Sequence, residues 1–257
     1  MSDILSIGAG AAQLYRQSLA TVSNNIANLN TEGYSRQVAT STESMPSQQG
    51  TVFIGTGARL DNITRAYDEF IESSLRDSNS DLSTQEPMIS YANRIVDLMG
   101  SQTSGLSSAL DKFFATASDL SADPASTIQR NMFVRDAEGL ASRFRELSGH
   151  LSAIETESQS GITLQVSTVN TLTKQLATIN TQLNGKISIA KQPAGLLDQR
   201  DQVLRDLSDI SKIHISEAPS GEVSVRLGSS SGSLLVDGKK SVDLGVSFDA
   251  NDPGRVD

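Results

Sequence analysis

An apolar stripe near the start of the chain is the feature that most limits how this sequence can fold. From residue 12 onward, apolar side chains recur at alternating spacings of three and four residues, the a/d pattern of a helix packed along a narrow seam. The stripe comprises Ile4, Leu5, Ala12, Tyr15, Leu19, Val22, Ile26 and Leu29. One helix cannot bury such a stripe alone, so we expect residues 4–29 to form a coiled-coil-type helix that needs a partner helix.

An asparagine-rich segment follows the stripe without a break. It reads Asn24-Asn25-Ile26-Ala27-Asn28-Leu29-Asn30-Thr31-Glu32-Gly33-Tyr34-Ser35-Arg36-Gln37. Asparagine caps helix ends and tolerates left-handed dihedral angles, and Gly33 supplies a positive φ if the turn needs one. The segment therefore predicts a helix end and a turn. That interpretation leaves open why asparagine is so frequent, since lysine or serine would end a helix as well.

The amino-acid composition argues against several classes of function. Of the 257 residues, 20% are charged and 4% are aromatic, with no tryptophan, which suits helices packed through aliphatic side chains. The formal net charge is -9 and lysine and arginine do not cluster, which argues against nucleic-acid binding. Cysteine is absent, which excludes disulfides and cysteine-based metal sites. We find neither an apolar run of membrane-spanning length nor a signal peptide, so we expect no membrane partner.

Long helices are expected after an extended stretch. Residues 38–66 look non-helical, with a polar loop at 41–50 and short extended segments at 51–57 and 59–63. We then expect a helix from Ile63 to about Met99, kinked or interrupted at Pro87, a break at 100–105, and a short helix over 106–117.

The longest periodic segment comes next. Asp123-Pro124 has the composition of a helix start. The periodicity after it predicts one helix of about 60 residues, ended by Gly185 or by Gln192-Pro193, which is typical of a coiled-coil bundle. A further helix is expected from Pro193 to Ile210, with Asp201 and Arg205 paired on its exposed face.

The last part of the chain alternates like half-buried strands. These strands are expected at 213–215, 223–227, 234–236 and 242–248, with Asp237-Gly238 as a hairpin turn. The predicted fold class is mainly α: an N-terminal coiled-coil-type helix and an elongated helical bundle with long helices, followed by a β-rich domain. We place the domains at 1–62, 63–211 and 212–257, and we expect the last to be truncated.

Two segments resemble a known family. The run from Asn24 through Gly33-Tyr34-Ser35-Arg36-Gln37 resembles the N-terminal signature of bacterial flagellar axial proteins, which form rod, hook and hook-associated layers. The helix Leu196–Ser208, with its Asp198-Gln199-Arg200-Asp201 run, resembles the hook-associated proteins at the hook–filament junction. Rod and hook proteins are β-rich after the shared signature, so the long helices here favour the hook-associated branch.

The resemblance implies a structural role outside the cell. It implies self-assembly into a tubular layer of the flagellum, between the hook protein and hook-associated protein 3, after export without a cleaved signal and with the help of an export chaperone. It also implies that a C-terminal helix, beyond residue 257, pairs with the N-terminal one. The assembly interface implied by the signature contains Leu5, Ala12, Tyr15, Leu19, Val22, Asn24, Asn25, Ile26, Asn28, Leu29, Asn30, Gly33, Tyr34 and Arg36.

Catalytic, cofactor and metal sites are not expected. Gly8-Ala9-Gly10 has no preceding strand and no third glycine, so it is not a dinucleotide loop. His150 and His214 lie far apart, each without a second ligand nearby. The carboxylates after Leu197 alternate with arginines, which predicts a salt-bridged and solvated helix face and not a metal cluster; they are Asp198, Asp201, Asp206 and Asp209.

An alternative function remains open at this point. A helical coiled-coil signalling or scaffold protein would also have long apolar seams, and it would dimerise through residues 124–185. Such a protein has no reason to carry the asparagine-rich signature, which is the feature that discriminates the two hypotheses.

Overall fold

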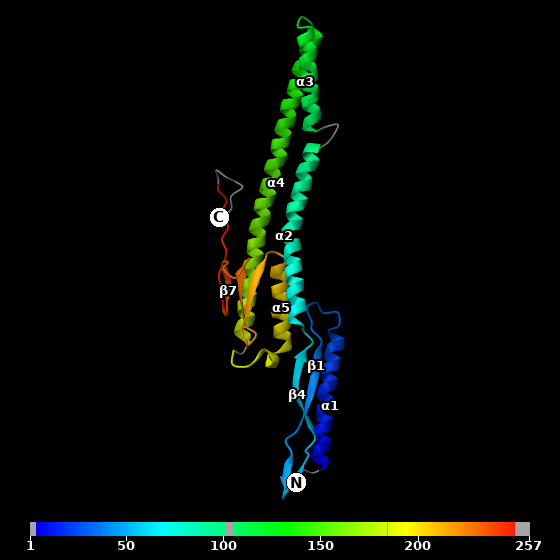
Figure 1. The fold of residues 1–257 in the computed structure, drawn as a ribbon, viewed down its shortest axis with the longest axis vertical. Helices are drawn as coiled ribbons and strands as arrows, with labels where there is room; N and C mark the ends of the chain where they lie inside the picture. The colour runs from blue at the N-terminus through cyan, green and yellow to red at the C-terminus, as the bar shows by residue number, and fades with distance from the viewer. Residues whose placement is uncertain (1–3, 101–104, 184, 250–257) are drawn as a thin grey trace. The chain divides into compact units, whose positions relative to one another are not determined.

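The computed structural model describes residues 4–100, 105–183 and 185–249, and Figure 1 labels the helices α1–α5 and three of the strands. The chain forms two compact units, one from residues 1–81 with 169–244 and the other from residues 82–168 with 245–257. Two long helices, α2 (Glu69–Gly100) and α4 (Thr127–Gln182), each contribute to both units. The domain limits expected at residues 62 and 211 stay predictions.

The first unit begins with a helix laid on a two-stranded ribbon (Figure 1). Helix α1 (Ile4–Ala27) lies against β1 (Gln37–Glu43) and β4 (Ala58–Arg65), which pair antiparallel. Beyond them, β2 (Ser47–Gln49) and β3 (Val52–Ile54) form a second short hairpin. The expected polar loop at 41–50 is therefore wrong at both ends, because the backbone of residues 41–43 and 47–49 pairs with neighbouring strands although the side chains are polar.

Helix α2 begins later than the sequence predicts. Residues 63–65 pair with β1, and the helix starts at Glu69, after Asp68. The Asp68 carboxylate accepts hydrogen bonds from the backbone N–H groups of Phe70 (3.0 Å) and Ile71 (3.2 Å), which satisfies two otherwise unpaired donors of the first turn. Pro87 lies inside α2 and does not end it.

The second unit contains α3 (Leu106–Ala122) and the first part of α4. The expected short helix over 106–117 and the single long helix after it are confirmed, whereas most of the expected break at 100–105 lies outside the described residues. Helix α4 starts at Thr127 and not at Pro124, because the Ser126 hydroxyl caps it by accepting from the Gln129 N–H (3.3 Å).

The apolar core lies in the other unit. Among the described residues, every fully buried apolar side chain belongs to residues 169–236. The core joins the C-terminal part of α4, helix α5 (Ala194–Ser208) and the sheet that follows them. It comprises Val169, Leu172, Leu176, Ala177, Ile179, Val203, Leu204, Leu207, Val223, Val225, Leu235 and Val236. A short 3-10 helix, η1 (Ile189–Lys191), precedes α5.

The sheet has the strand order β5-β6-β7-β8 and is antiparallel. Its strands are β5 (Ile213–Glu217), β6 (Val223–Leu227), β7 (Leu234–Asp237) and β8 (Lys240–Ser241). The turn after Asp237 is confirmed, with Gly238 at φ 53°. The fold class, mainly α with long helices followed by β strands, is confirmed.

Asparagine side chains on α4 hold the backbone that follows or forms this sheet. The Asn170 amide donates to the Leu244 carbonyl (2.9 Å) and accepts from the Leu244 N–H (2.8 Å). The Asn180 amide does the same with Val223 of β6, at 2.8 and 3.1 Å. The strand expected at 242–248 is therefore wrong over most of its length, because the backbone at Leu244 is bound by a helix side chain and not by a neighbouring strand.

Candidate assembly surface

Helix α1 has two chemically different faces. The side that lies on the ribbon carries Ile7, Ala11, Leu14, Ser18 and Thr21, all at least partly buried. The apolar stripe lies roughly a quarter turn around the helix from that side. Its members stay in solvent: Leu19 is 66% exposed and Ile26 is 70% exposed. Within the described residues, the stripe therefore has no apolar cover. An exposed a/d seam on a helix anchored by a neighbouring face is the construction expected of a surface that pairs elsewhere.

The asparagine-rich segment is an internal clasp. The Asn25 amide donates to the Gln37 carbonyl (2.9 Å) and accepts from the Gln37 N–H (2.9 Å), so it occupies the place of a strand partner. The Tyr34 hydroxyl donates to Asn25 Oδ1 (2.7 Å) and accepts from Asn24 Nδ2 (3.1 Å). We call Asn24, Asn25, Tyr34 and Gln37 the asparagine clasp. It accounts for Asn25, because a side-chain amide carries a donor and an acceptor on separate atoms and can bind the C=O and the N–H of one residue together.

Asn28 extends the clasp along the helix end. Its amide donates to the Asn24 carbonyl (2.9 Å) and accepts from the Thr31 hydroxyl (3.2 Å). Asn30 and Arg36 are exposed. Partial burial raises the pKa of the Tyr34 hydroxyl, and the negative charge of Asp198 raises it further. Tyr34 therefore stays protonated at neutral pH and remains a donor. The assembly role expected for these residues stays a prediction.

Gly33 fits this turn against α5 and gives a testable expectation. Its φ is +75°, and a Cβ there would lie 2.7 Å from Gln202 Oε1 and 3.3 Å from Arg205 Nη2. We expect Gly33→Ala to lower the free energy of unfolding in urea by about 1–2 kcal/mol from the backbone conformation alone. Gly8→Ala is the control, since a Cβ at Gly8 meets nothing within 4 Å and alanine favours the helix. Equal loss of stability in both variants would contradict the expectation.

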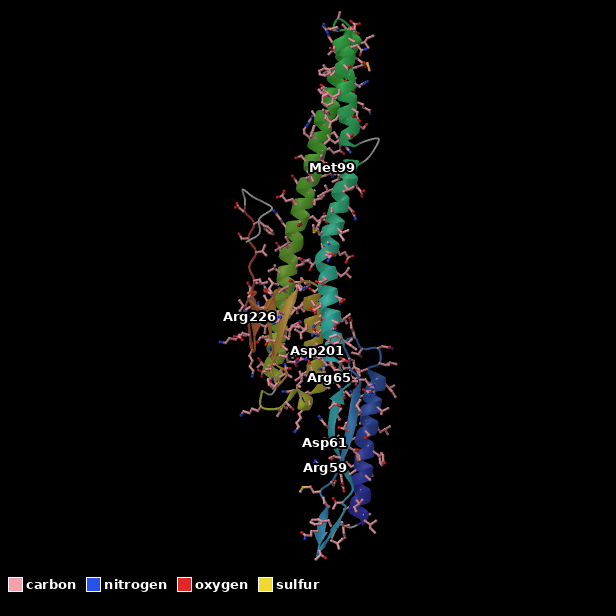
Figure 2. The ribbon with its side chains drawn as sticks, in the orientation of Figure 1. Arg59, Asp61, Arg65, Met99, Asp201 and Arg226 are labelled. Carbon is pink, nitrogen blue, oxygen red and sulfur yellow. The ribbon has the colours of Figure 1, made fainter. Side chains whose placement is uncertain are left out.

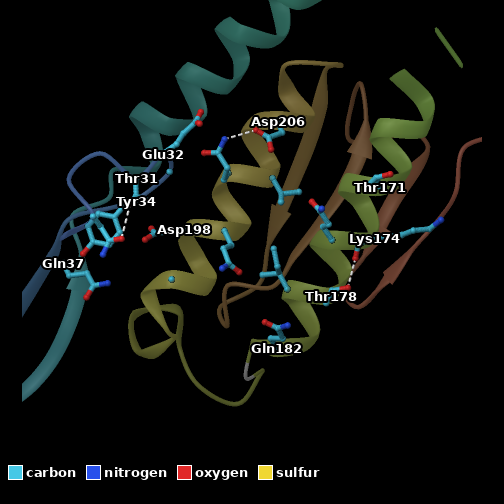
Figure 3. Close-up of a pocket in the computed structure, with 18 of the residues that line it drawn as sticks. Thr31, Glu32, Tyr34, Gln37, Thr171, Lys174, Thr178, Gln182, Asp198 and Asp206 are labelled. Atoms are coloured by element: carbon cyan, nitrogen blue, oxygen red, sulfur yellow. Dashed lines mark hydrogen bonds between the residues drawn. The ribbon is translucent and has the colours of Figure 1, made fainter. Parts of the chain in front are cut away.

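An open groove lies between the turn, α4 and α5 (Figure 3). Its volume is about 1020 Å³. Tyr34 and Asp198 line one side, and Lys174 and Thr178 of α4 line the other. Ile179 and Val203 also line it. Positively and negatively charged side chains both line the groove. The described residues contain no cluster of three or more metal-ligating side chains. None of the described helices is long and apolar enough to cross a membrane.

The first two carboxylates of α5 are buried, so the predicted solvated helix face is wrong there. Asp198, Arg200 and Asp201 are buried, at 7%, 1% and 1% exposure, and do not form a solvated face. Arg65 Nη1 from β4 contacts Asp198 Oδ1 (2.9 Å) and Asp201 Oδ2 (2.7 Å). Figure 2 labels Arg65 and Asp201, which lie in the same region of the structure. Arg200 Nη1 contacts Glu217 of β5 (2.6 Å), and Arg200 Nη2 contacts Asp201 (2.6 Å). Burial lowers the pKa of Arg200, but Asp201 and Glu217 outweigh that effect and raise it.

The expected Asp201–Arg205 pair is also wrong. Arg205 instead contacts Glu72 of α2 (2.8 Å), because Asp201 faces the interior. Asp209 accepts from Asn79 (3.1 Å), and Asp206 accepts from Gln202 (2.8 Å). Sequence reasoning missed Arg65 altogether. One signal was available for Asp201: it lies four residues after Leu197 and three before Leu204, on the apolar face of α5.

These features together define a class: a helical subunit with an exposed apolar seam on its N-terminal helix. Residues 92–257 match the family described as "Flagellar hook-associated protein FlgK helical domain", and residues 5–34 match "Flagella basal body rod protein". The first match covers more than half of the chain, so the chain belongs to the FlgK family of flagellar hook-associated proteins. The resemblance drawn from the two sequence motifs is confirmed.

Individual relatives agree with this assignment. The flagellar hook-associated protein 1 of Salmonella typhimurium is 27% identical over 258 residues, covering 100% of this chain and 46% of that protein. The Bacillus subtilis protein of the same name is 25% identical over 247 residues, covering 93% and 49%. The chain thus spans about half the length of the curated relatives it matches. The flagellar hook junction protein FlgK from Burkholderia pseudomallei superposes with a TM-score of 0.60 at 26% identity, over 72% of this chain and 32% of that one.

Proposed function

We propose that this protein is a structural component of the bacterial flagellum that joins hook to filament by self-assembly into an axial tubular layer. The observation that carries the proposal is the exposed apolar stripe on α1, a helix already anchored on another face. A stripe of this kind gains free energy only when another helix covers it. Membership in the family of flagellar hook-associated proteins supports the proposal.

The proposal includes partners and location. Copies of the chain form a homo-oligomer in the flagellar axis, with the hook protein on one side and hook-associated protein 3 on the other. An export chaperone accompanies the chain before it leaves through the flagellar channel without a cleaved signal, to work outside the cell. The stripe pairs with a C-terminal helix of the same protein. The role is structural and not enzymatic, and it uses no cofactor.

Deletion of the gene in the source bacterium tests the proposal. We expect cells that build complete hooks but carry no filaments, because the junction layer is missing, and electron microscopy of the cell surface reads this out. Return of the full-length gene should restore filaments and swimming. Filaments of normal number and length on the deletion strain would refute the proposed role.

A solution measurement separates this function from a coiled-coil scaffold. We expect the purified chain to be monomeric at low micromolar concentration in sedimentation velocity, because the proposed function places no pairing surface on the long helix. A scaffold would instead dimerise through residues 124–185. A stable dimer mapped to that segment by crosslinking would favour the scaffold.

A further inference from the structure

The N-terminal arm, residues 4–66, shares no buried apolar core with the body it contacts. We use "the body" for residues 169–244, which contain the end of α4, α5 and the sheet. The core cluster of buried apolar residues runs from Val169 to Val236 and includes no residue of the arm. The arm must therefore be held to the body by other contacts, and the described contacts are polar.

Those contacts converge on α5. The buried Arg65–Asp198 and Arg65–Asp201 pairs join the last residue of β4 to the helix, with the Arg65 side chain only 6% exposed. Asp198 also accepts from the Ser35 N–H (3.3 Å), so one carboxylate contacts the arm twice. Asn62 donates to the Ala190 carbonyl (2.7 Å), before α5. The Tyr67 ring lies 4.6 Å from the Arg65 guanidinium carbon.

The ion pairs that hold the arm extend through Arg200 to the sheet. Asp201 is shared, because Oδ2 contacts Arg65 of the arm while Oδ1 contacts Arg200 of the body. Arg200 then contacts Glu217 of β5 and donates to the Gly221 carbonyl (2.6 Å). Because the carboxylate that binds the arm is fixed by a second arginine and by the sheet, its position does not depend on the arm. We call Arg65, Asp198, Arg200, Asp201 and Glu217 the ionic bridge.

We propose that the ionic bridge sets the direction in which the arm carries α1 relative to the body, with Asp198 and Asp201 as a preformed receptor and Arg65 as the group it holds. Buried ion pairs contribute little net stability but permit few geometries, so they specify an orientation more than they stabilise a fold. Arg65 is thereby a positioning residue for the apolar stripe. The proposal deepens the proposed function, because the angle of α1 decides where its stripe meets a partner.

Loss of Arg65 should release the arm and leave the body folded. Asp201 keeps Arg200 as its partner, and Asp198, once uncovered, is solvated by water instead of being buried unpaired. The asparagine clasp and the β1–β4 pairing lie within the arm, so the arm should move as one piece.

Distances between spin labels test this on the purified chain. The protein has no cysteine, so labels on Gln13→Cys of α1 and Gln175→Cys of α4, both exposed, report the arm–body distance alone. A second pair, Gln13→Cys with Asp61→Cys on β4, reports the arm itself. We expect one narrow peak for each pair in the parent chain. Arg65→Met or Asp198→Asn should broaden and shift the arm–body peak and leave the peak within the arm unchanged.

The controls make each outcome decisive. Asp243→Asn removes a carboxylate from an exposed pair with Lys174, more than half exposed on both sides, and should move neither peak. The double variant Arg65→Met/Asp198→Asn should be no broader than Arg65→Met alone. Arg65→Met already removes the ion pair that Asp198→Asn breaks, and the amide oxygen left by Asp198→Asn can still accept from the Ser35 N–H. An unchanged arm–body peak in Arg65→Met, additive effects, or loss of the body's helical circular dichroism would overturn the proposal. None of these results depends on flagellar assembly, so the proposal can fail while the proposed function stands, and the reverse.

Discussion

Full-length protein carrying Leu19→Asp is expected to fold and to reach the flagellum, yet to support no filaments on completed hooks. Leu19 lies in the middle of the apolar stripe and is 66% exposed, so an aspartate there costs the isolated chain little. In an assembled seam the same carboxylate would be buried among apolar side chains without a partner, at a cost of several kcal/mol, about 3 or more. Ile26→Asp, at 70% exposure in the same stripe, should act in the same way.

Complementation of the deletion strain measures this, with filament counts by electron microscopy and swimming as the readouts. Gln17→Asp is the matched control, because it puts the same charge on the same helix at an exposed position outside the stripe. Circular dichroism of the purified variants should show the helical content of the parent chain. Normal filaments in the Leu19→Asp strain would mean that the stripe is not an interface.

The second large effect is expected inside the body. Asn180 is fully buried, and its amide donates to the carbonyls of Val223 and Gly238 and accepts from the Val223 N–H. Asn180→Asp keeps the shape but replaces the donor by a charged acceptor that faces two carbonyl oxygens. We expect the free energy of unfolding at neutral pH to fall by about 3 kcal/mol or more.

Urea unfolding followed by circular dichroism provides the measurement. Gln175→Glu on the same helix makes the same amide-to-acid change at an exposed position, and it should shift the midpoint little. The loss in Asn180→Asp should shrink as the pH falls, since a protonated carboxyl regains a donor and loses its charge. Equal midpoints for the two variants at neutral pH would show that the Asn180 amide does not hold β6.

Periodicity predicted the parts of this fold that depend on the chain's local pattern. Apolar residues spaced three and four apart predicted the long helix Thr127–Gln182, because a strand would need alternation with a period of two. The turn residues Asp237-Gly238 predicted the hairpin. The spacing of the apolar residues also predicted the stripe of α1. Because no other segment near it in the sequence has a matching apolar stripe, the stripe was expected to need a partner helix. Each of these features depends on residues that lie close together in the sequence.

The ionic bridge could not be read in that way. Arg65 and Asp201 are far apart in sequence, and a run of alternating Asp and Arg residues looks the same whether it faces water or a buried cation. Which arginine meets which aspartate is decided by where β4 ends and how α5 is turned, and both are tertiary facts. The strand expected at 242–248 failed for the same reason, since Asn170 binds Leu244 from another element.

Three contacts in this protein share one design, in which a helix asparagine holds both hydrogen-bonding groups of a single peptide-chain residue: Asn25 with Gln37, Asn170 with Leu244, and Asn180 with Val223. Such a contact binds only the backbone N–H and C=O groups of the held residue and does not involve its side chain. These hydrogen bonds therefore place no demand on the side chain of the held residue. At Val223 that demand comes instead from the apolar core, in which the side chain is 1% exposed. The helices thus set the register of the held segments separately from the packing of the side chains around them.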